Sequence, residues 1–341
     1  MTKRAARSRT MNNTRTLTFG MLCNRLAEPK NTLIICHARP DGDAVGSAFA
    51  LKEILRQIGC EAYCICADEV PKRLKFLTSS IQSSSLIDAI PEDFIPQRVI
   101  TVDTAALSQM GKLESFFGGS VDIMIDHHRV GEPYADHYID PTAAATGEII
   151  FKIAEALLTS KGKSIPLCVC KCLYAAISSD TGCFKYSNVT PSTHIAAASL
   201  IKNGIDAAEI NRLLFDTKSP ARLHAEKVGL DNLKLFMDFK VAVVALDYDD
   251  IERLGVDHEE FDAFIDAARL VEGAEVAVSI RRPYPDEAFR ISMRSMSKVD
   301  VSVICAEFGG GGHVKASGCS IETDSIEKAI EMILVEIAKQ L

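Results

Sequence analysis

Short β-type runs alternate with longer helical segments between residues 31 and 180, and this alternation restricts the fold of the chain more than any other feature. We predict strands at residues 32–36, 60–67, 98–102 and 121–125. We predict helices at residues 44–58, 145–159 and 166–179, where apolar residues recur at helical spacing. Strands separated by helices are typical of a parallel sheet, so the pattern predicts an α/β domain with helices on both faces of the sheet.

After residue 180 the pattern changes to that of a smaller α+β domain. We predict helices at residues 192–203, 206–215, 301–308 and 325–340, and strands at residues 240–246, 275–281, 288–295 and 316–321. The chain therefore divides into a basic tail that we expect to be disordered, a catalytic domain, a helical linker and a second domain, at residues 1–20, 21–190, 191–235 and 236–341.

Charge and cysteine content exclude several classes of function. The 46 acidic residues outnumber the 38 lysines and arginines, for a net charge of −8, which argues against a surface that binds long duplex nucleic acid through its phosphates. No apolar stretch approaches the roughly 20 residues that span a membrane. Eleven cysteines without a C-x-x-C pair indicate core residues in a reducing compartment, so we expect a cytoplasmic protein.

Aspartates and histidines gather where the predicted elements of the first domain end. The residues are His37, Asp41 and Asp43 after the first strand, Asp103 after the third, Asp126, His127 and His128 after the fourth, and Asp180 after the apolar segment 173–179. The carboxyl ends of neighbouring parallel strands meet in one crevice, where such groups would repel one another unless cations held them. The sequence thus predicts a site for more than one metal ion.

The types of these ligands select the metal and the reaction. Carboxylates mixed with imidazoles, without a convincing thiolate, suit Mn²⁺, with Mg²⁺ as the alternative. Two such ions about 3.5–4 Å apart clamp the attacking and leaving oxygens of a phosphoryl displacement. The pattern therefore predicts metal-assisted hydrolysis of a phosphoester. The competing interpretations are helix capping by Asp41, Asp43 or Asp103, and a turn at Asp180.

A run of glycines in the second domain is the other informative stretch. Gly309 to Gly312 precede His313, and Lys315 follows. Glycines let backbone N–H groups approach an anion closely, so the run predicts a phosphate-binding loop. Arg294, at the end of a predicted strand, could add a guanidinium. The alternatives are a flexible connector for the glycines and simple solvation for Arg294.

The clusters His37-x-x-Pro40-Asp41-x-Asp43, Val102-Asp103, Asp126-His127-His128 and Ser179-Asp180-Thr181-Gly182, in this order, resemble the motifs of the DHH phosphoesterase superfamily. The resemblance implies one Mn²⁺ held by His37, Asp41 and Asp103. It implies a second held by Asp43, Asp103, His127 and Asp180, so that Asp103 bridges the two ions. It also implies that His128 contacts the scissile phosphate or assists the leaving oxygen, and that Asp126 orients an imidazole.

The Arg294-Ser295 pair and the glycine run before His313 resemble the DHHA1 domain of this superfamily, particularly in its stand-alone oligoribonuclease (NrnA-like) type. The resemblance implies an active site in the cleft between the two domains. It implies that substrate is bound by Arg294, Ser295, Gly311, Gly312, His313 and Ser317, with Arg39 reaching the phosphate.

The implied activity is hydrolysis of short oligoribonucleotides to 5′-mononucleotides, and of pAp to AMP. The alternative is hydrolysis of a cyclic dinucleotide such as c-di-AMP, or of its linear product pApA, because relatives with the same two domains do this. A nucleotide sensor and an inorganic pyrophosphatase are less well supported, since every metal position carries a competent ligand and the Ser-Arg-Lys-Lys signature of pyrophosphatases is missing. The expected partners are short RNA or small nucleotides, and a homodimer is compatible with the pattern.

Overall fold

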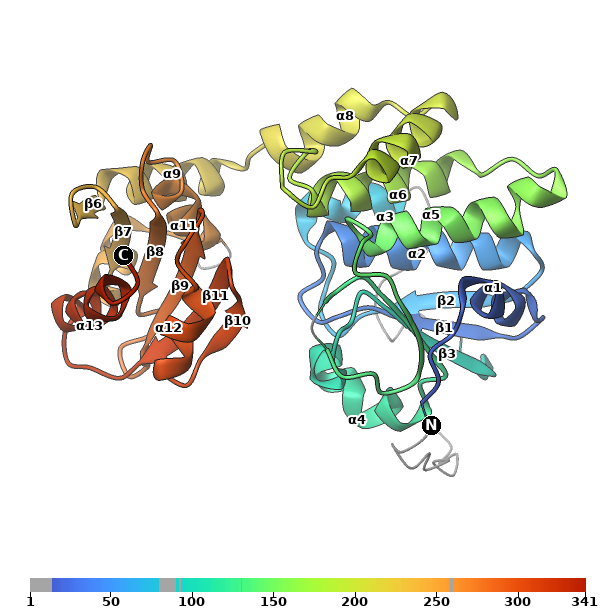
Figure 1. The fold of residues 1–341 in the computed structure, drawn as a ribbon, viewed down its shortest axis with the longest axis horizontal. Coiled ribbons are helices and arrows are strands. Elements are labelled where there is room, and N and C mark those ends of the chain that lie inside the picture. Colours follow the sequence, from blue (N-terminus) through green and yellow to red (C-terminus); the bar gives the residue numbers. More distant parts are fainter. Residues whose placement is uncertain (1–13, 80–89, 92, 130, 258–259) are drawn as a thin grey trace. The chain divides into compact units, whose positions relative to one another are not determined.

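The computed structural model describes residues 14–79, 90–91, 93–129, 131–257 and 260–341 (Figure 1). The chain forms two compact units, residues 1–217 and 218–341. Most of the tail that we predicted to be disordered, residues 1–13, lies outside the described residues. The segment 191–235, which we predicted as a linker, is shared between the two units.

The first unit is built on a five-stranded sheet whose strands all run parallel. The order is β2-β1-β3-β4-β5. The strands are β1 (Thr32–Ile35), β2 (Ala62–Ile65), β3 (Arg98–Val102), β4 (Ile123–Asp126) and β5 (Asp136–Ile139). The strand order reverses at β1, and ligands bind beyond the carboxyl ends of the strands at such a reversal. The predicted parallel α/β fold is confirmed.

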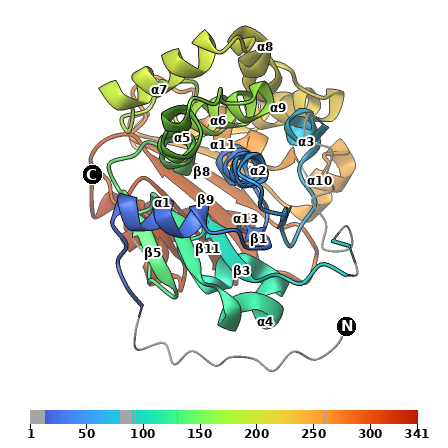
Figure 2. The same cartoon turned by 90° about the vertical axis from the view of Figure 1, so that its right-hand side faces the viewer.

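Helices cover both faces of this sheet. The helices of this unit are α1 (Phe19–Ala27), α2 (Gly42–Gln57), α3 (Lys75–Ser79), α4 (Glu114–Phe117), α5 (Thr146–Leu157), α6 (Leu167–Asp180), α7 (Pro191–Lys202) and α8 (Ala207–Asn211). Helices α2 and α5 pack on one face, over Ile34 and Ile100, and α6 packs against both of them, whereas α4 and the 3₁₀ segment Leu107–Leu113 lie at the other face (Figure 2). Alternate strand residues enter the two cores, as expected for a sheet buried on both sides.

Helices α2 and α6 approach each other closely because α2 carries glycines where they meet. A Cβ added at Gly46 would lie 2.4 Å from the carbonyl oxygen of Cys172 and 2.9 Å from Cβ of Ala176. A Cβ added at Gly42 would lie 2.5 Å from Cβ of Ser179. This close packing brings the first turn of α2 beside the last turn of α6.

The second unit contains a mixed six-stranded sheet in the order β10-β11-β9-β8-β7-β6. Its strands are β6 (Leu233–Phe236), β7 (Val241–Leu246), β8 (Val276–Arg281), β9 (Phe289–Ser295), β10 (Gly311–His313) and β11 (Ala316–Ile321). Helices α12 (Val301–Glu307) and α13 (Ile326–Ala338) pack on one face of the sheet. Helices α9 (Pro220–Asp231), α10 (Tyr248–Leu254) and α11 (Asp262–Ala268) pack on the other. The predicted smaller α+β domain is therefore confirmed.

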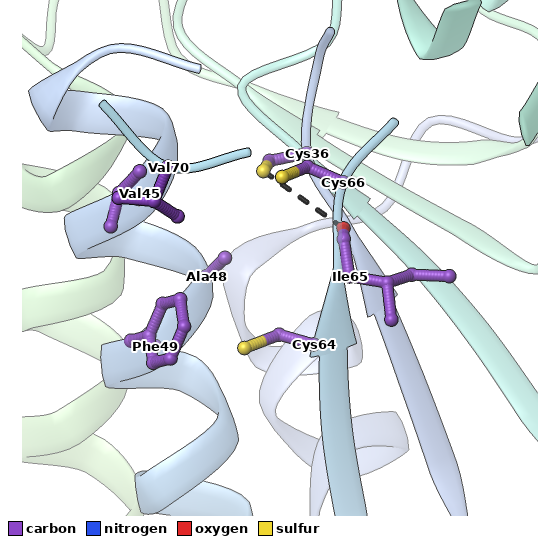
Figure 3. Close-up of a pocket in the computed structure, with 8 residues that line it drawn as sticks. All are labelled: Cys36, Val45, Ala48, Phe49, Cys64, Ile65, Cys66 and Val70. Atoms are coloured by element: carbon purple, nitrogen blue, oxygen red, sulfur yellow. Dashed lines mark hydrogen bonds between the residues drawn. The ribbon is translucent and has the colours of Figure 1, made fainter. Parts of the chain in front are cut away.

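All eleven cysteines are free thiols, and most are buried. Cys36, Cys64 and Cys66 line a small pocket between β1, β2 and α2, together with apolar side chains such as Phe49 (Figure 3). Their interpretation as core residues is confirmed. Within the described part of the chain, no helix combines the length and the apolar character that crossing a membrane requires.

Glu275, directly before β8, ties this strand to the loop between β9 and α12. Its carboxylate accepts hydrogen bonds from the hydroxyl of Ser297 at 2.6 Å, from the backbone N–H of Ser297 at 3.0 Å and from that of Val299 at 3.0 Å. Burial acts to raise the pKa of Glu275, but these bonds outweigh it and lower the pKa to about 2. The charged form is therefore favoured in the folded protein.

Acid is consequently expected to remove the contribution of Glu275 to stability. A carboxylate with a lowered pKa stabilises the fold above its unfolded pKa, and this contribution is lost as the pH falls from about 4.5 towards 2. We expect Glu275→Gln to lower the free energy of unfolding by about 1 kcal/mol at pH 7 and by much less near pH 2. Urea unfolding followed by circular dichroism at both pH values measures this. An equal loss at both would contradict the prediction.

Candidate metal centre

The predicted ligands come from separate elements and meet at the carboxyl edge of the first sheet. His37 and Asp41 lie between β1 and α2, and Asp43 lies in the first turn of α2. Asp103 directly follows β3, and His127 directly follows β4. The sixth predicted ligand, Asp180, is the last residue of helix α6 rather than the end of a strand. The structure therefore brings together all six predicted ligands.

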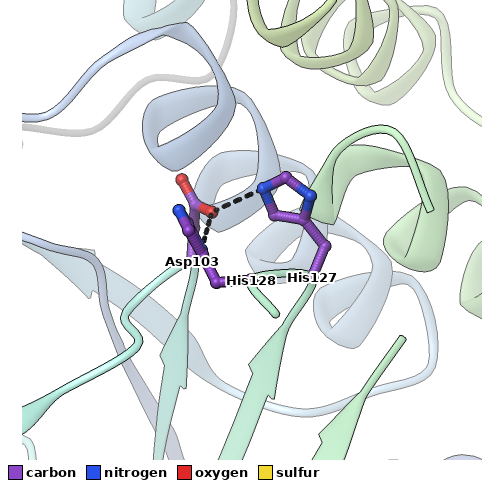
Figure 4. A group of neighbouring side chains, drawn as sticks. All are labelled: Asp103, His127 and His128. Carbon is purple, nitrogen blue, oxygen red and sulfur yellow. Dashed lines mark ion pairs between the residues drawn. The ribbon is translucent and has the colours of Figure 1, made fainter. Parts of the chain in front are cut away.

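Asp103 is buried at the centre of the cluster, and its two carboxylate oxygens face different partners. Oδ2 lies 3.6 Å from Nε2 of His37, and Oδ1 lies 3.8 Å from Nε2 of His127. Oδ1 also lies 3.8 Å from Nδ1 of His128, and Figure 4 shows the two imidazoles beside this carboxylate. A carboxylate placed in this way can contribute one oxygen to each of two ions.

Two further ligand groups adjoin Asp103. On one side, Nε2 of His37 lies 3.8 Å from Oδ1 of Asp41, and these two residues form a group with Asp103. On the other side, Nε2 of His127 lies 3.9 Å from Oδ2 of Asp43 and 3.5 Å from Oδ2 of Asp180. The first group contains the same residues as one ligand set that the family resemblance implied, and the second contains three of the four residues of the other set, without Asp103.

The distances between ligand atoms fit cations better than direct hydrogen bonds. Separations of 3.5–3.9 Å exceed the usual length of an N–H···O bond. Ligands about 2.1 Å from a shared octahedral ion lie roughly 3.0–4.2 Å apart. The donor set of imidazole nitrogens and carboxylate oxygens also suits Mn²⁺ or Mg²⁺. The residues present therefore fit the metal ions that the sequence predicts.

The electrostatics of the cluster indicate an excess of negative charge. Burial and the neighbouring carboxylates of Asp103 and Asp180 raise the pKa of Asp43 well above its usual range. Burial, with a contribution from Asp103, raises the pKa of Asp180 to about 6. For His37, burial acts to lower the pKa, but the nearby carboxylates of Asp103 and Asp41 more than offset it and raise the pKa to about 11. A bound cation would relieve this excess charge.

Backbone carbonyls fix the orientation of two candidate ligands. Nδ1 of His37 lies 2.8 Å from the carbonyl oxygen of Ala38, and Nδ1 of His127 lies 3.3 Å from that of Ala143. Since Nδ1 is engaged in both residues, Nε2 is the nitrogen that faces the carboxylates. This is a common arrangement of histidines that bind metal ions.

Asp126 braces His128. Oδ1 of the buried Asp126 lies 2.8 Å from Nδ1 of His128 and accepts a hydrogen bond of the same length from the backbone N–H of His127. The hydrogen bond to Asp126 raises the pKa of His128 to about 9, against the effect of burial. The rings of His127 and His128 are inclined by 57° to each other, so the two imidazoles face different directions.

Helix capping, the competing interpretation of these aspartates, also applies to Asp41. Asp41 is the N-cap of α2, and its Oδ1 accepts hydrogen bonds from the backbone N–H groups of Asp43 and Ala44, both at 3.0 Å. The same oxygen faces His37. Asp41 therefore caps the helix and belongs to the cluster at once.

Arg39 is exposed, with its backbone N–H bonded to Asp68.

The predicted substrate-binding residues of the second unit do not all lie on the same face of the sheet. Ser295 and Ser317 are buried on the face covered by α12 and α13, and Ser295 contacts Glu275 and Lys315. Arg294 is half-buried on the opposite face. Gly311, Gly312 and His313 form the short strand β10, which pairs with β11. The substrate-binding roles of these residues stay predictions.

Sequence reasoning missed Thr146 and Gly147, which begin α5 and contact carboxylates of the cluster. One signal could have pointed to them, because the first N–H groups of a helix lack partners within the helix and need acceptors elsewhere. Neither residue belongs to a type that marks a metal site by itself.

Comparison with curated proteins found relatives that match over both units. The bifunctional oligoribonuclease and PAP phosphatase NrnA of Thermus thermophilus is 29% identical over 312 residues, which cover 90% of this chain and 89% of the relative. The cyclic-di-AMP phosphodiesterase GdpP of Geobacillus thermodenitrificans is 23% identical, and the match covers 90% of this chain but 47% of that protein.

A solved structure of similar fold and two family models also match this chain. An exopolyphosphatase-related protein from Bacteroides fragilis shares the fold, with a TM-score of 0.83, 24% identity and coverage of 93% of this chain and 94% of that one. Residues 31–177 match the model of the DHH family N-terminal domain, and residues 238–339 match that of the DHHA1 domain. The chain therefore belongs to the DHH family and carries a DHH domain followed by a DHHA1 domain.

Proposed function

We propose that this protein is a metal-dependent phosphoesterase that hydrolyses short oligoribonucleotides to 5′-mononucleotides and pAp to AMP. The observation that carries the proposal is the position of Asp103, whose two oxygens face two groups of Asp and His side chains. The likeness to the oligoribonuclease and PAP phosphatase of Thermus thermophilus over nearly the whole chain supports this choice of substrates.

In this proposal His37, Asp41 and Asp103 hold one divalent cation, and Asp43, Asp103, His127 and Asp180 hold the other. Such cations neutralise charge that develops on the phosphate and lower the pKa of water. His128 contacts the substrate through Nε2, because Asp126 occupies its Nδ1. Asp126 thereby keeps the imidazole in the orientation needed to assist the leaving oxygen.

The reaction is tested by incubating purified protein with Mn²⁺ and, in parallel, pGpG, pAp or c-di-AMP, and by quantifying the products chromatographically. We expect mononucleotides from pGpG and AMP from pAp. If none of the three substrates is hydrolysed, the proposal is overturned. A clear preference for c-di-AMP would favour the second candidate, a cyclic dinucleotide phosphodiesterase, which the similarity to GdpP over 90% of this chain supports.

Arg294 is expected to bind the phosphate or base of the substrate. A guanidinium that hydrogen bonds to a charged group contributes about 1.5–3 kcal/mol, so we expect Arg294→Ala to lower kcat/KM for pAp by about 10–100-fold, mainly through KM. Arg290→Ala is the matched control, because Arg290 lies four positions earlier on β9 and its exposed side chain bonds to Glu287 at 2.7 Å. Equal effects of the two substitutions on kcat/KM would contradict a role for Arg294 in binding.

A further inference from the structure

Helix α5 begins beside the candidate metal cluster, and its first two residues donate hydrogen bonds to the carboxylates of Asp43 and Asp103. The backbone N–H of Thr146 lies 2.7 Å from Oδ2 of Asp43, and that of Gly147 lies 2.9 Å from Oδ1. The hydroxyl of Thr146 donates to Oδ1 of Asp103 at 3.0 Å. Thr146, Asp43 and Asp103 are 0%, 1% and 3% exposed. Thr146 thus connects two carboxylates that bulk water hardly reaches.

These contacts hold Asp43 on both of its oxygens. The first N–H groups of a helix lack intrahelical acceptors, so bonds to Asp43 satisfy the helix end and the buried carboxylate together. The partial positive charge at the start of α5 also offsets part of the negative charge of the cluster. Ser47 adds a third donor, with its hydroxyl 2.9 Å from Oδ1 of Asp43.

The contact with Asp103 depends on a side chain rather than on the backbone. The hydroxyl of Thr146 meets Oδ1, the oxygen that faces His127, and Oδ2 faces His37. A donor on one oxygen fixes the rotation of the carboxylate group. The rotation of Asp103 decides whether each of its oxygens faces one of the two ligand groups.

We propose that Thr146 is a positioning residue, which orients Asp103 and thereby sets the affinity of the cluster for divalent cations. The proposal rests on the proposed function only in that the cluster binds metal ions, and it is independent of the substrate. Hydrogen-bond partners of metal ligands of this kind contribute about 10–100-fold to metal affinity.

The test is a titration of the full-length protein with Mn²⁺ in the absence of substrate, in which electron paramagnetic resonance quantifies the free ion. Thr146→Val keeps the branched shape and removes the hydroxyl, and we expect it to weaken Mn²⁺ binding by about 10–100-fold. Thr146→Ser keeps the hydroxyl, and we expect it to bind Mn²⁺ nearly as well as the unaltered protein. If the valine variant does not fold, as judged by circular dichroism, Thr146→Ala replaces it, because the smaller side chain cannot overpack the site.

Thr193→Val is the matched control. The hydroxyl of Thr193 also donates to a buried carboxylate, Oε2 of Glu148 at 3.0 Å, but Glu148 does not belong to the metal cluster. We expect this variant to lose stability without losing Mn²⁺ affinity, which separates positioning from a general effect on the fold.

Unchanged Mn²⁺ affinity in the variant without the hydroxyl would overturn the proposal, and so would a serine variant that binds as weakly as the valine variant. A protein that binds Mn²⁺ in the predicted manner but hydrolyses none of the nucleotides would refute the proposed function and leave the role of Thr146 intact. A protein that does not bind Mn²⁺ at all would overturn both.

Discussion

Asp103→Asn is expected to reduce hydrolysis of every substrate by at least about 100-fold, because both cations lose a shared anionic ligand. Metal ions contribute several kcal/mol of charge stabilisation to the transition state, and the loss of ~3 kcal/mol corresponds to ~100-fold in rate. Asparagine is the informative replacement, since Asp103 has a φ of 54° and Asn, like Asp, tolerates the left-handed region. Steady-state kinetics at saturating Mn²⁺ measure the effect.

Asp122→Asn is the control for this substitution. Asp122 precedes β4, away from the carboxyl edge of the sheet, and its carboxylate accepts a hydrogen bond from the backbone N–H of Val99 at 3.0 Å. We expect this variant to retain near-normal kcat. An Asp103→Asn variant with more than a tenth of the normal rate would contradict a bridging position for Asp103.

Gly46→Ala is expected to lower the free energy of unfolding of the first unit by about 2–3 kcal/mol, the upper part of the range for overpacked cores. The added methyl group would overlap the carbonyl oxygen of Cys172, so α2 and α6 must move apart. Asp43 and Asp180 lie on these two helices, and the separation should therefore also weaken Mn²⁺ binding. Urea unfolding and Mn²⁺ titration measure the two effects.

Gly20→Ala provides the comparison, because Gly20 lies in the first turn of α1 and an added Cβ there would meet no atom within 4 Å. Alanine is also the better helix former, so this change should leave stability unchanged or raise it slightly. Equal stability of the two variants would show that the contact between α2 and α6 tolerates a methyl group.

The sequence could predict which residues meet in the candidate metal cluster of the first unit because the topology of the sheet places them there. Once β1, β3 and β4 are recognised as parallel strands, His37, Asp103 and His127 must meet at one edge of the sheet. Asp180 is the last residue of helix α6, and sequence alone does not determine how closely this helix approaches α2. That distance depends on Gly46 and on the small residues of α6 that pack against it.

Other features depend on contacts that no local pattern encodes. The glycine run before His313 has the composition of a loop, yet Gly311 and Gly312 pair with Gly318 and Ser317 of β11. Ser295 and Ser317 resemble surface residues by type, but alternation along β9 and β11 turns them towards the core. Thr146 lies more than 40 positions from Asp103, so only the tertiary structure shows that it contacts the site.

The candidate ligands are spread over a long stretch of the sequence, and this has a consequence for biosynthesis. The candidate ligands begin with His37 and end with Asp180, and they come from loops and helices that only the folded sheet brings together. A nascent chain that has not yet emerged past Asp180 carries an incomplete ligand set, so it should capture cations only weakly. If the cluster binds metal ions as proposed, only the folded state presents the whole ligand set, and metal binding would then add to the stability of the first unit. Metal binding would thus stabilise only a chain that has folded across the whole sheet.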